Sequence, residues 1–170
     1  APILTGKIIM DYELPEELRM MKDTLRRFVD REIIPIERDA YVGHELKPDI
    51  RAMLEEKIKK IGLWMFDVPE EFGGLGMNLL ARCVVWEEMG RTIAIPTRGG
   101  HIFGPPVSPI LYFLSDDQKE QYLWPVLRGE KNCAFAQTEP DAGGDPGGMR
   151  TTAVLDGNHY VINGYKRYIT

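Results

Sequence analysis

The residues with the clearest chemical potential lie in a glycine-rich loop at positions 133–148, CAFAQTEPDAGGDPGG. Pro, Asp and Gly supply the backbone angles of tight turns, so composition alone favours a simple connection between strands. A sharper interpretation is that glycines, which lack a Cβ, let backbone N–H groups approach an anion such as pyrophosphate closely. The sequence contains no GxxxxGK[ST] and no GxGxxG between a strand and a helix, so any phosphate site here is of neither the P-loop nor the Rossmann type.

Two threonines could add hydrogen-bonding groups to such a site. Thr138 lies inside the loop, and Thr170 follows the aromatic Tyr168 in a strand-like run. Each hydroxyl can donate and accept, which suits a flat heterocycle with polar edges. The commoner use of an isolated threonine is to satisfy nearby backbone. Glu139, in the Thr-Glu-Pro turn, is expected to order the loop rather than to act as an acid or a base.

These residues follow a long stretch with helical periodicity. Apolar residues recur every three or four positions from Leu14 until a kink expected at Pro35, and a second helix is expected from Pro48 to Gly62. Asn78 can cap a third helix that Gly90 stops. That third helix is expected to present a broad apolar side formed by Leu79, Leu80, Cys83, Val84 and Trp86.

The helical part is expected to continue to about residue 130. A fourth helical piece is predicted around 107–114, and Ser115 with Gln118 forms a capping-box pattern for a fifth. Pro125 and Gly129 are expected to close this half of the chain.

Beyond Lys131 the pattern becomes that of β structure. The segment RTTAVLDGNHYVINGYKRYIT, residues 150–170, carries β-branched and aromatic residues between Asp-Gly and Asn-Gly turn signals. We therefore expect an α+β multidomain chain, all-helical over residues 1–130 and β over residues 131–170. The strand-like run has no stop signal at Thr170, so the β unit is expected to be unfinished.

Composition and charge exclude several classes of function. The net charge of −5 and pI near 5.3 argue against a surface that binds nucleic acid or anionic lipid. The apolar runs are too short to predict a membrane span. The histidines, His44, His101 and His159, and the cysteines, Cys83 and Cys133, lie far apart in sequence, so no metal site is predicted.

Several motifs together resemble the acyl-CoA dehydrogenase family. They are FAQTEPDAGGD at 135–145 and INGYKRYIT at 162–170, supported upstream by VPEEFGGLG at 68–76, WEEMGR at 86–91 and LSDDQKEQYLWPVLRGEK at 114–131. The resemblance implies an all-helical N-terminal domain, then an antiparallel β-barrel domain that begins here, and a C-terminal four-helix bundle that is absent from this sequence.

The resemblance also implies an FAD site. Phe135, Ala136, Gln137 and Thr138 would border the flavin, with Gly143 and Gly144 beside the phosphate-bearing chain of the cofactor. The other side of the site would comprise Tyr168 against the isoalloxazine, Ile169, and Thr170 as a donor near N5. Gly144 and His101 would be the substrate-binding candidates, although a partly buried histidine satisfied by its surroundings is the commoner use of a residue such as His101.

In this family a glutamate removes the α-proton of an acyl-CoA thioester, and the β-hydrogen passes as hydride to FAD, which gives a trans-2-enoyl-CoA. That glutamate belongs to the C-terminal domain, so no catalytic residue is assigned here. The implied partners are the acyl-CoA substrate, an electron-transfer flavoprotein as electron acceptor, and further copies in a homodimer or homotetramer. The implied location is the cytoplasm, or the mitochondrial matrix in a eukaryote.

Two residues depart from the family pattern and keep alternatives open. The family commonly has Ser at the position of Gly144, and Trp at that of Tyr168. The lost hydroxyl at Gly144 weakens the case for CoA binding, whereas Tyr168 keeps an aromatic face. Alternatives within the superfamily are an acyl-CoA oxidase, a flavin monooxygenase or a nitroalkane oxidase. An alternative of another class is a non-catalytic helical binding or assembly module.

Overall fold

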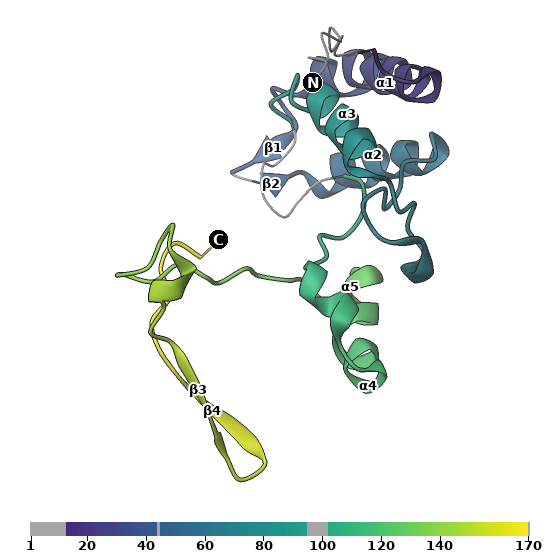
Figure 1. Cartoon of the computed structure of the whole chain (residues 1–170). Helices are drawn as coiled ribbons and strands as arrows, with labels where there is room; N and C mark the ends of the chain where they lie inside the picture. The colour runs from purple at the N-terminus through teal and green to yellow at the C-terminus, as the bar shows by residue number, and fades with distance from the viewer. Residues whose placement is uncertain (1–12, 44, 95–101, 170) are drawn as a thin grey trace, which may run out of the picture. The chain divides into compact units, whose positions relative to one another are not determined.

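The computed structural model describes residues 13–43, 45–94 and 102–169. The chain divides into two compact units, residues 1–104 and 105–170 (Figure 1). The first is mostly helical, and the second combines a short helical segment with a β-hairpin. Each of the two sheets found in the described residues is two-stranded and antiparallel. In the part of the chain that the structure describes, no helix has the length and apolar character needed to cross a bilayer.

The first unit is built on three α-helices. They are α1 (Glu16–Phe28), α2 (Pro48–Lys60) and α3 (Leu79–Met89). The run of α1 continues through a π-helical turn, Val29–Ile33, and a 3₁₀ turn, Ile34–Ile36, which contains Pro35. The strands β1 (Tyr41–Val42) and β2 (Glu45–Leu46) pair between α1 and α2 in sequence.

The predicted start of α3 is confirmed by its cap. The side chain of Asn78 accepts a hydrogen bond from the backbone N–H of Ala81 at 3.0 Å, so one otherwise unpaired donor of the first turn is satisfied. Pro48 occupies the first position of α2, where a missing N–H costs nothing.

The core of the first unit gathers apolar side chains from all three helices and from the loops between them. Its fully buried members include Leu25, Ile33, Leu54, Ile58, Phe66, Val85, Ile102 and Phe103. Phe66, Trp86 and Phe103 meet edge to face, with ring centroids 5.2–6.2 Å apart. Such pairs add to the stabilisation that burial of the rings provides.

The predicted apolar side of α3 is only partly correct. Val84 is buried, but Leu79 and Leu80 are 77% and 49% exposed, Trp86 is 42% exposed and Cys83 is exposed. The buried side consists of Ala81, Val84, Val85, Glu88 and Met89. Apolar residues cover most of the circumference of this helix, so their spacing alone could not select the face that packs.

The VPEEFGGLG segment is a compact loop closed by its own backbone. The N–H of Gly76 donates to the carbonyl of Val68 at 2.8 Å, and a 3₁₀ turn, Glu70–Phe72, lies between them. A Cβ on Gly74 would lie 2.1 Å from the Val68 carbonyl oxygen, so only glycine fits there. This motif therefore has a structural explanation.

The second unit begins with helical turns. A 3₁₀ helix, Pro109–Phe113, stands where a helical piece was predicted, and it is followed by α4 (Asp116–Gln118), a π-helical turn (Lys119–Leu123) and α5 (Trp124–Leu127). The predicted capping box of Ser115 and Gln118 is confirmed. Pro125 lies at the start of α5 rather than ending the helical part, because its missing N–H is tolerated in a first turn.

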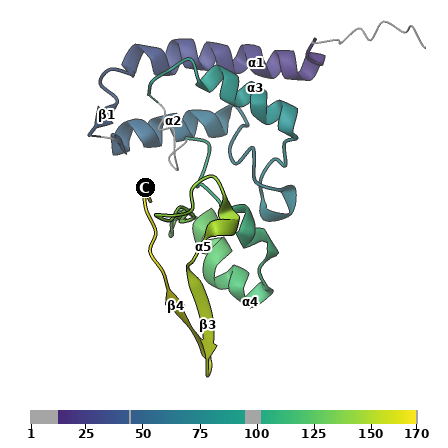
Figure 2. The same ribbon diagram turned by 60° about the vertical axis from the view of Figure 1, so that its left-hand side comes forward.

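The hairpin pairs β3 (Thr152–Asp156) with β4 (His159–Asn163) as an extended two-stranded ribbon (Figure 2). The Asp-Gly signal is confirmed as its turn, in which Gly157 has a φ of +60°. Asn163-Gly164 instead ends β4, and residues 164–169 form no strand, contrary to the strand expected at Tyr168. Tyr168 itself has a φ of +56°, outside the β region.

Candidate functional site

Two segments of the second unit that are far apart in sequence lie side by side. The backbone N–H of Arg167 donates to the carbonyl of Thr138 at 2.9 Å. The ammonium of Lys166 donates to the carbonyl of Gln137 at 3.0 Å, across 29 residues of sequence. The stretch 135–138 is therefore held next to the stretch 166–168, which brings together the two groups of residues that the sequence singled out.

Glu139 is the centre of this contact. Its side chain is 5% exposed and accepts from the Lys166 ammonium at 2.8 Å and from the backbone N–H groups of Arg150 and Thr151 at 2.6 and 3.1 Å. Lys166 is the main cause that lowers the pKa of Glu139 to about 2, assisted by hydrogen bonds from Thr151 and Arg150. The expectation that Glu139 orders the loop is confirmed.

The rest of the glycine-rich loop is folded by local hydrogen bonds. Glu139 and Ala142 exchange backbone N–H to carbonyl bonds at 2.9 and 3.3 Å. Asp145 accepts from the backbone N–H of Gly147 at 2.9 Å and so tightens the next turn. Backbone carbonyl groups and the Asp145 carboxylate therefore hold the shape of the loop before any ligand is considered.

Gly164 fits closely against Thr151. A Cβ on Gly164 would lie 2.1 Å from Thr151 Oγ1, far inside contact distance. The glycine of the Asn-Gly pair therefore permits the chain after β4 to return beside Thr151, whose N–H binds Glu139. Its role is close approach of two segments, not a hairpin turn.

The candidate site residues differ in their exposure. Phe135 and Tyr168 are each 78% exposed, and Ala136, Gly143, Gly144 and Ile169 are also exposed, while Gln137 and Thr138 are half-buried. The guanidinium of Arg167 lies 5.0 Å from the centroid of the Tyr168 ring. A Cβ at Gly143 or Gly144 would meet nothing within 4 Å, so the space beside each of these residues is empty. Thr170 and His101 lie outside the described residues.

The chemistry of this donor set is suited to a flat heterocycle that carries a phosphate chain. The exposed rings of Phe135 and Tyr168 offer apolar faces, and Gln137 and Thr138 offer an amide and a hydroxyl for polar edges. Open glycine backbone is the surface that approaches phosphate oxygens most closely. The residues present therefore fit a dinucleotide with an aromatic ring system.

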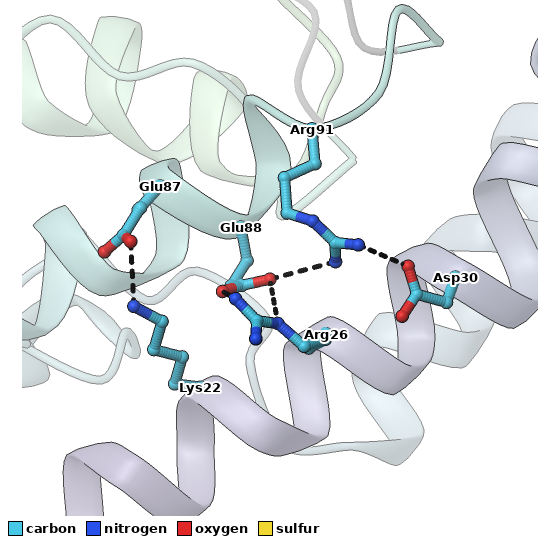
Figure 3. Close-up of polar contacts among 6 residues, drawn as sticks. All are labelled: Lys22, Arg26, Asp30, Glu87, Glu88 and Arg91. Atoms are coloured by element: carbon cyan, nitrogen blue, oxygen red, sulfur yellow. Dashed lines mark hydrogen bonds and ion pairs between the residues drawn. The ribbon is translucent and has the colours of Figure 1, made fainter.

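A second polar cluster, in the first unit, was not foreseen from the sequence. It links α1 and the π-helical turn that follows it to α3 and the residues just after α3. Its members are Lys22, Arg26, Asp30, Glu87, Glu88 and Arg91 (Figure 3). Arg26 holds the Glu88 carboxylate in two hydrogen bonds, at 2.9 and 3.2 Å. Arg91 donates to Glu88 at 3.1 Å and to Asp30 at 2.6 Å.

Glu88 has a fully buried side chain, unlike its neighbour Glu87, which is 61% exposed and pairs with Lys22. The pKa of Arg26 is raised mainly by its hydrogen bonds to Glu88, and that of Arg91 mainly by Asp30. The sequence alone carries no clear signal for this cluster, because the burial of Val85, three residues before Glu88, is seen only in the structure. The cluster fixes one helix against another.

The comparison with known protein families assigns the chain. Residues 15–130 match the family described as acyl-CoA dehydrogenase, N-terminal domain. This chain belongs to the acyl-CoA dehydrogenase family.

Individual relatives agree with this assignment. The chain is 35% identical to the mitochondrial short-chain specific acyl-CoA dehydrogenase of Sus scrofa, over 96% of this chain and 39% of that relative. It resembles an acyl-CoA dehydrogenase complexed with FAD from Bacillus anthracis, with a TM-score of 0.62, 31% identity and coverage of 92% of this chain and 27% of that one. A chain in a structure described as an electron transferring flavoprotein of Acidaminococcus fermentans matches with a TM-score of 0.65, 28% identity and coverage of 94% and 41%. The chain thus spans only 39% of the length of the Sus scrofa relative.

Proposed function

We propose that this chain is part of an FAD-dependent acyl-CoA dehydrogenase that converts an acyl-CoA thioester to a trans-2-enoyl-CoA. Residues 1–130 would form its helical N-terminal domain, and residues 131–170 would begin its β-barrel domain. The observation that supports the proposal most directly is the 2.9 Å hydrogen bond between Arg167 and Thr138, which joins the two segments that would border the flavin. The C-terminal bundle with the catalytic base would lie in sequence outside these residues.

The residues proposed to hold FAD come from both segments. They are Phe135, Ala136, Gln137, Thr138, Gly143 and Gly144 from the loop, and Tyr168, Ile169 and Thr170 from the end of the chain. The bound cofactor would supply a hydride acceptor, which no amino-acid side chain provides. Gly144 and His101 are proposed to contact the substrate.

Each part of the proposed site has a distinct physical task. Phe135 and Tyr168, both exposed, would cover the faces of the ring system and exclude water from them. Thr138 would present a hydroxyl to a polar edge of the ring. Because Gly144 has no hydroxyl, only its backbone N–H could bind an oxygen of the phosphate chain or of the substrate.

The wider assignments follow from family membership. We propose an electron-transfer flavoprotein as the electron acceptor and a homodimer or homotetramer as the assembly. The mitochondrial matrix is proposed if the source is a eukaryote, in line with the mitochondrial relative of Sus scrofa, and the cytoplasm otherwise.

The test is to purify the product of the complete reading frame and identify any bound flavin after release. We expect a yellow protein that contains FAD and whose flavin is bleached without oxygen by an acyl-CoA of suitable chain length. A protein that takes up no FAD on reconstitution would contradict the proposal. Rapid oxygen consumption with the same substrate would instead identify an acyl-CoA oxidase.

A further inference from the structure

We propose that Glu139 and Lys166 form a clasp that positions residues 135–138 relative to residues 167–169 and so sets the geometry of the ring site. Neither residue is expected to touch the flavin, so both are positioning residues. This inference rests on the proposed function, because the ring it concerns is that of FAD. It adds a role for two charged residues that lie behind the proposed contact residues.

The clasp joins three separate stretches of chain. Lys166 donates to the Gln137 carbonyl and to the Glu139 carboxylate at 3.0 and 2.8 Å. Glu139 in turn accepts from the N–H groups of Arg150 and Thr151, just before β3. Loss of Glu139 would leave Lys166 and the N–H groups of Arg150 and Thr151 without their shared acceptor. Loss of Lys166 would leave the Glu139 carboxylate and the Gln137 carbonyl without their shared donor, so either change breaks the link between residues 137–139 and Lys166.

Among residues 132–169 themselves, apolar packing contributes little. Within residues 132–169, only Glu139 and Ala142 are buried. A segment with one buried methyl group has almost no hydrophobic stabilisation of its own. Within this stretch, the conformation of residues 135–138 is therefore held by polar contacts, and the charged, buried pair is the strongest of these.

The same loop contains an ion pair that serves as a matched control. Arg150 and Asp141 meet at 3.1 Å, but their side chains are 79% and 63% exposed. Water screens such a pair, so it holds the backbone weakly. Removal of either carboxylate takes away one negative charge from the loop, which separates the effect of the clasp from that of net charge.

The experiment compares Glu139→Gln, Lys166→Met and Asp141→Asn in the product of the complete reading frame. Hydrogen exchange of the FAD-free protein would be followed in peptides that cover residues 135–139 and 165–169. The FAD dissociation constant, the visible circular dichroism of the bound flavin and its reduction potential would then be measured. The last two report the surroundings of the ring, which a change in overall stability alone would not alter.

We expect Glu139→Gln and Lys166→Met to increase exchange in both peptides together and to weaken FAD binding by on the order of tenfold, the effect of one charged hydrogen bond. The flavin circular dichroism and potential should also shift, while Asp141→Asn behaves as wild type. The double variant should bind FAD no more weakly than the weaker-binding single variant, because both substitutions remove the same ion pair.

Three results would overturn the clasp. They are unchanged exchange and FAD affinity in either single variant, equal effects in Asp141→Asn, or additive losses in the double variant. If Glu139→Gln fails to accumulate, Lys166→Met decides, since it removes the same pair from the other side. A wild-type protein without FAD would contradict the proposed function, whereas the exchange measurement would still test the clasp.

Discussion

Two buried glutamates, one in each unit, are used in different ways. Glu88, on the side of α3 that faces α1, accepts hydrogen bonds from two arginines, Arg26 and Arg91. Glu139 lies in a loop and meets one lysine and two backbone N–H groups. Both carboxylates are compensated by charged hydrogen bonds, as burial of a charge requires.

What surrounds each glutamate decides what it controls. Glu88 packs on a core that already includes Leu25, Val29 and Val85, so it adds to the stability of helices that apolar burial places. Glu139 has a single buried apolar neighbour along its stretch of chain, Ala142, so it determines the backbone conformation itself. The first should be a determinant of stability, and the second a determinant of local geometry.

The largest effect is expected for Glu88→Ala. It removes the acceptor of Arg26 and Arg91, whose side chains are 50% and 34% exposed and can be partly rehydrated. We expect a loss of about 3 kcal/mol in unfolding free energy, at the low end for a broken buried pair. Urea denaturation of the complete protein, followed by circular dichroism, would measure it.

The neighbouring Glu87→Ala is the matched control. Glu87 is exposed and pairs with Lys22 at 2.8 Å, so no measurable loss is expected. Neither variant should change the visible circular dichroism of bound flavin. A change in that spectrum in Glu88→Ala would break the distinction between the two glutamates.

Gly164→Ala should have the next largest effect. Its Cβ would lie 2.1 Å from Thr151 Oγ1, so the chain after β4 must move away from the segment that binds Glu139. We expect a cost of about 2 kcal/mol, as for overpacking, together with weaker FAD binding.

Gly157→Ala provides the comparison for Gly164→Ala. Gly157 has a φ of +60° but no atom within 4 Å of an added Cβ, so only the backbone strain of about 1 kcal/mol is expected. FAD affinity should not change. Equal loss of FAD affinity in both variants would show that hairpin stability, rather than the approach of Gly164 to Thr151, matters for the site.

The features that sequence predicted correctly are local ones. The Asn78 cap, the Ser115 and Gln118 capping box and the Asp-Gly turn each depend on residues within a few positions of one another. The contacts that organise the two polar clusters cross 62 residues, from Arg26 to Glu88, and 27 residues, from Glu139 to Lys166. No periodicity or turn rule could supply those partners.

The same distinction explains the errors. Leu79, Leu80 and Trp86 are expected on the buried side of α3 but are exposed. The side that packs is set by partners distant in sequence, among them Arg26 on α1, which donates to Glu88. The strand expected at Tyr168 is absent. The backbone of Arg167 makes one hydrogen bond to Thr138, and the next residue, Tyr168, has a positive φ that turns the chain away from an extended conformation. For the site, family resemblance supplied the residues, and the structure supplied the clasp between them.

Asn78→Ala should have a smaller effect, confined to stability. It removes the side-chain acceptor at the start of α3 and should cost about 1 kcal/mol. Asn78→Asp, which keeps an acceptor oxygen, should restore most of the loss. FAD binding should stay unchanged in both variants, and a loss of FAD affinity in Asn78→Ala alone would show that α3 also influences the ring site.

The last effect to be tested is that of acid. The pKa of Glu139 is about 2 in the folded protein, against an ordinary value of 4.5, so between these values the unfolded chain binds a proton that the folded one does not. The stability that Glu139 contributes is thus complete above pH 4.5 and is lost as the pH falls towards 2. Urea midpoints between about pH 5 and about pH 3.5 should fall less steeply in Glu139→Gln than in wild type. Asp141→Asn, which loses an exposed ion pair, should keep the wild-type dependence of the urea midpoint on pH. If Glu139→Gln also keeps that dependence, Lys166 does not hold the Glu139 carboxylate in solution.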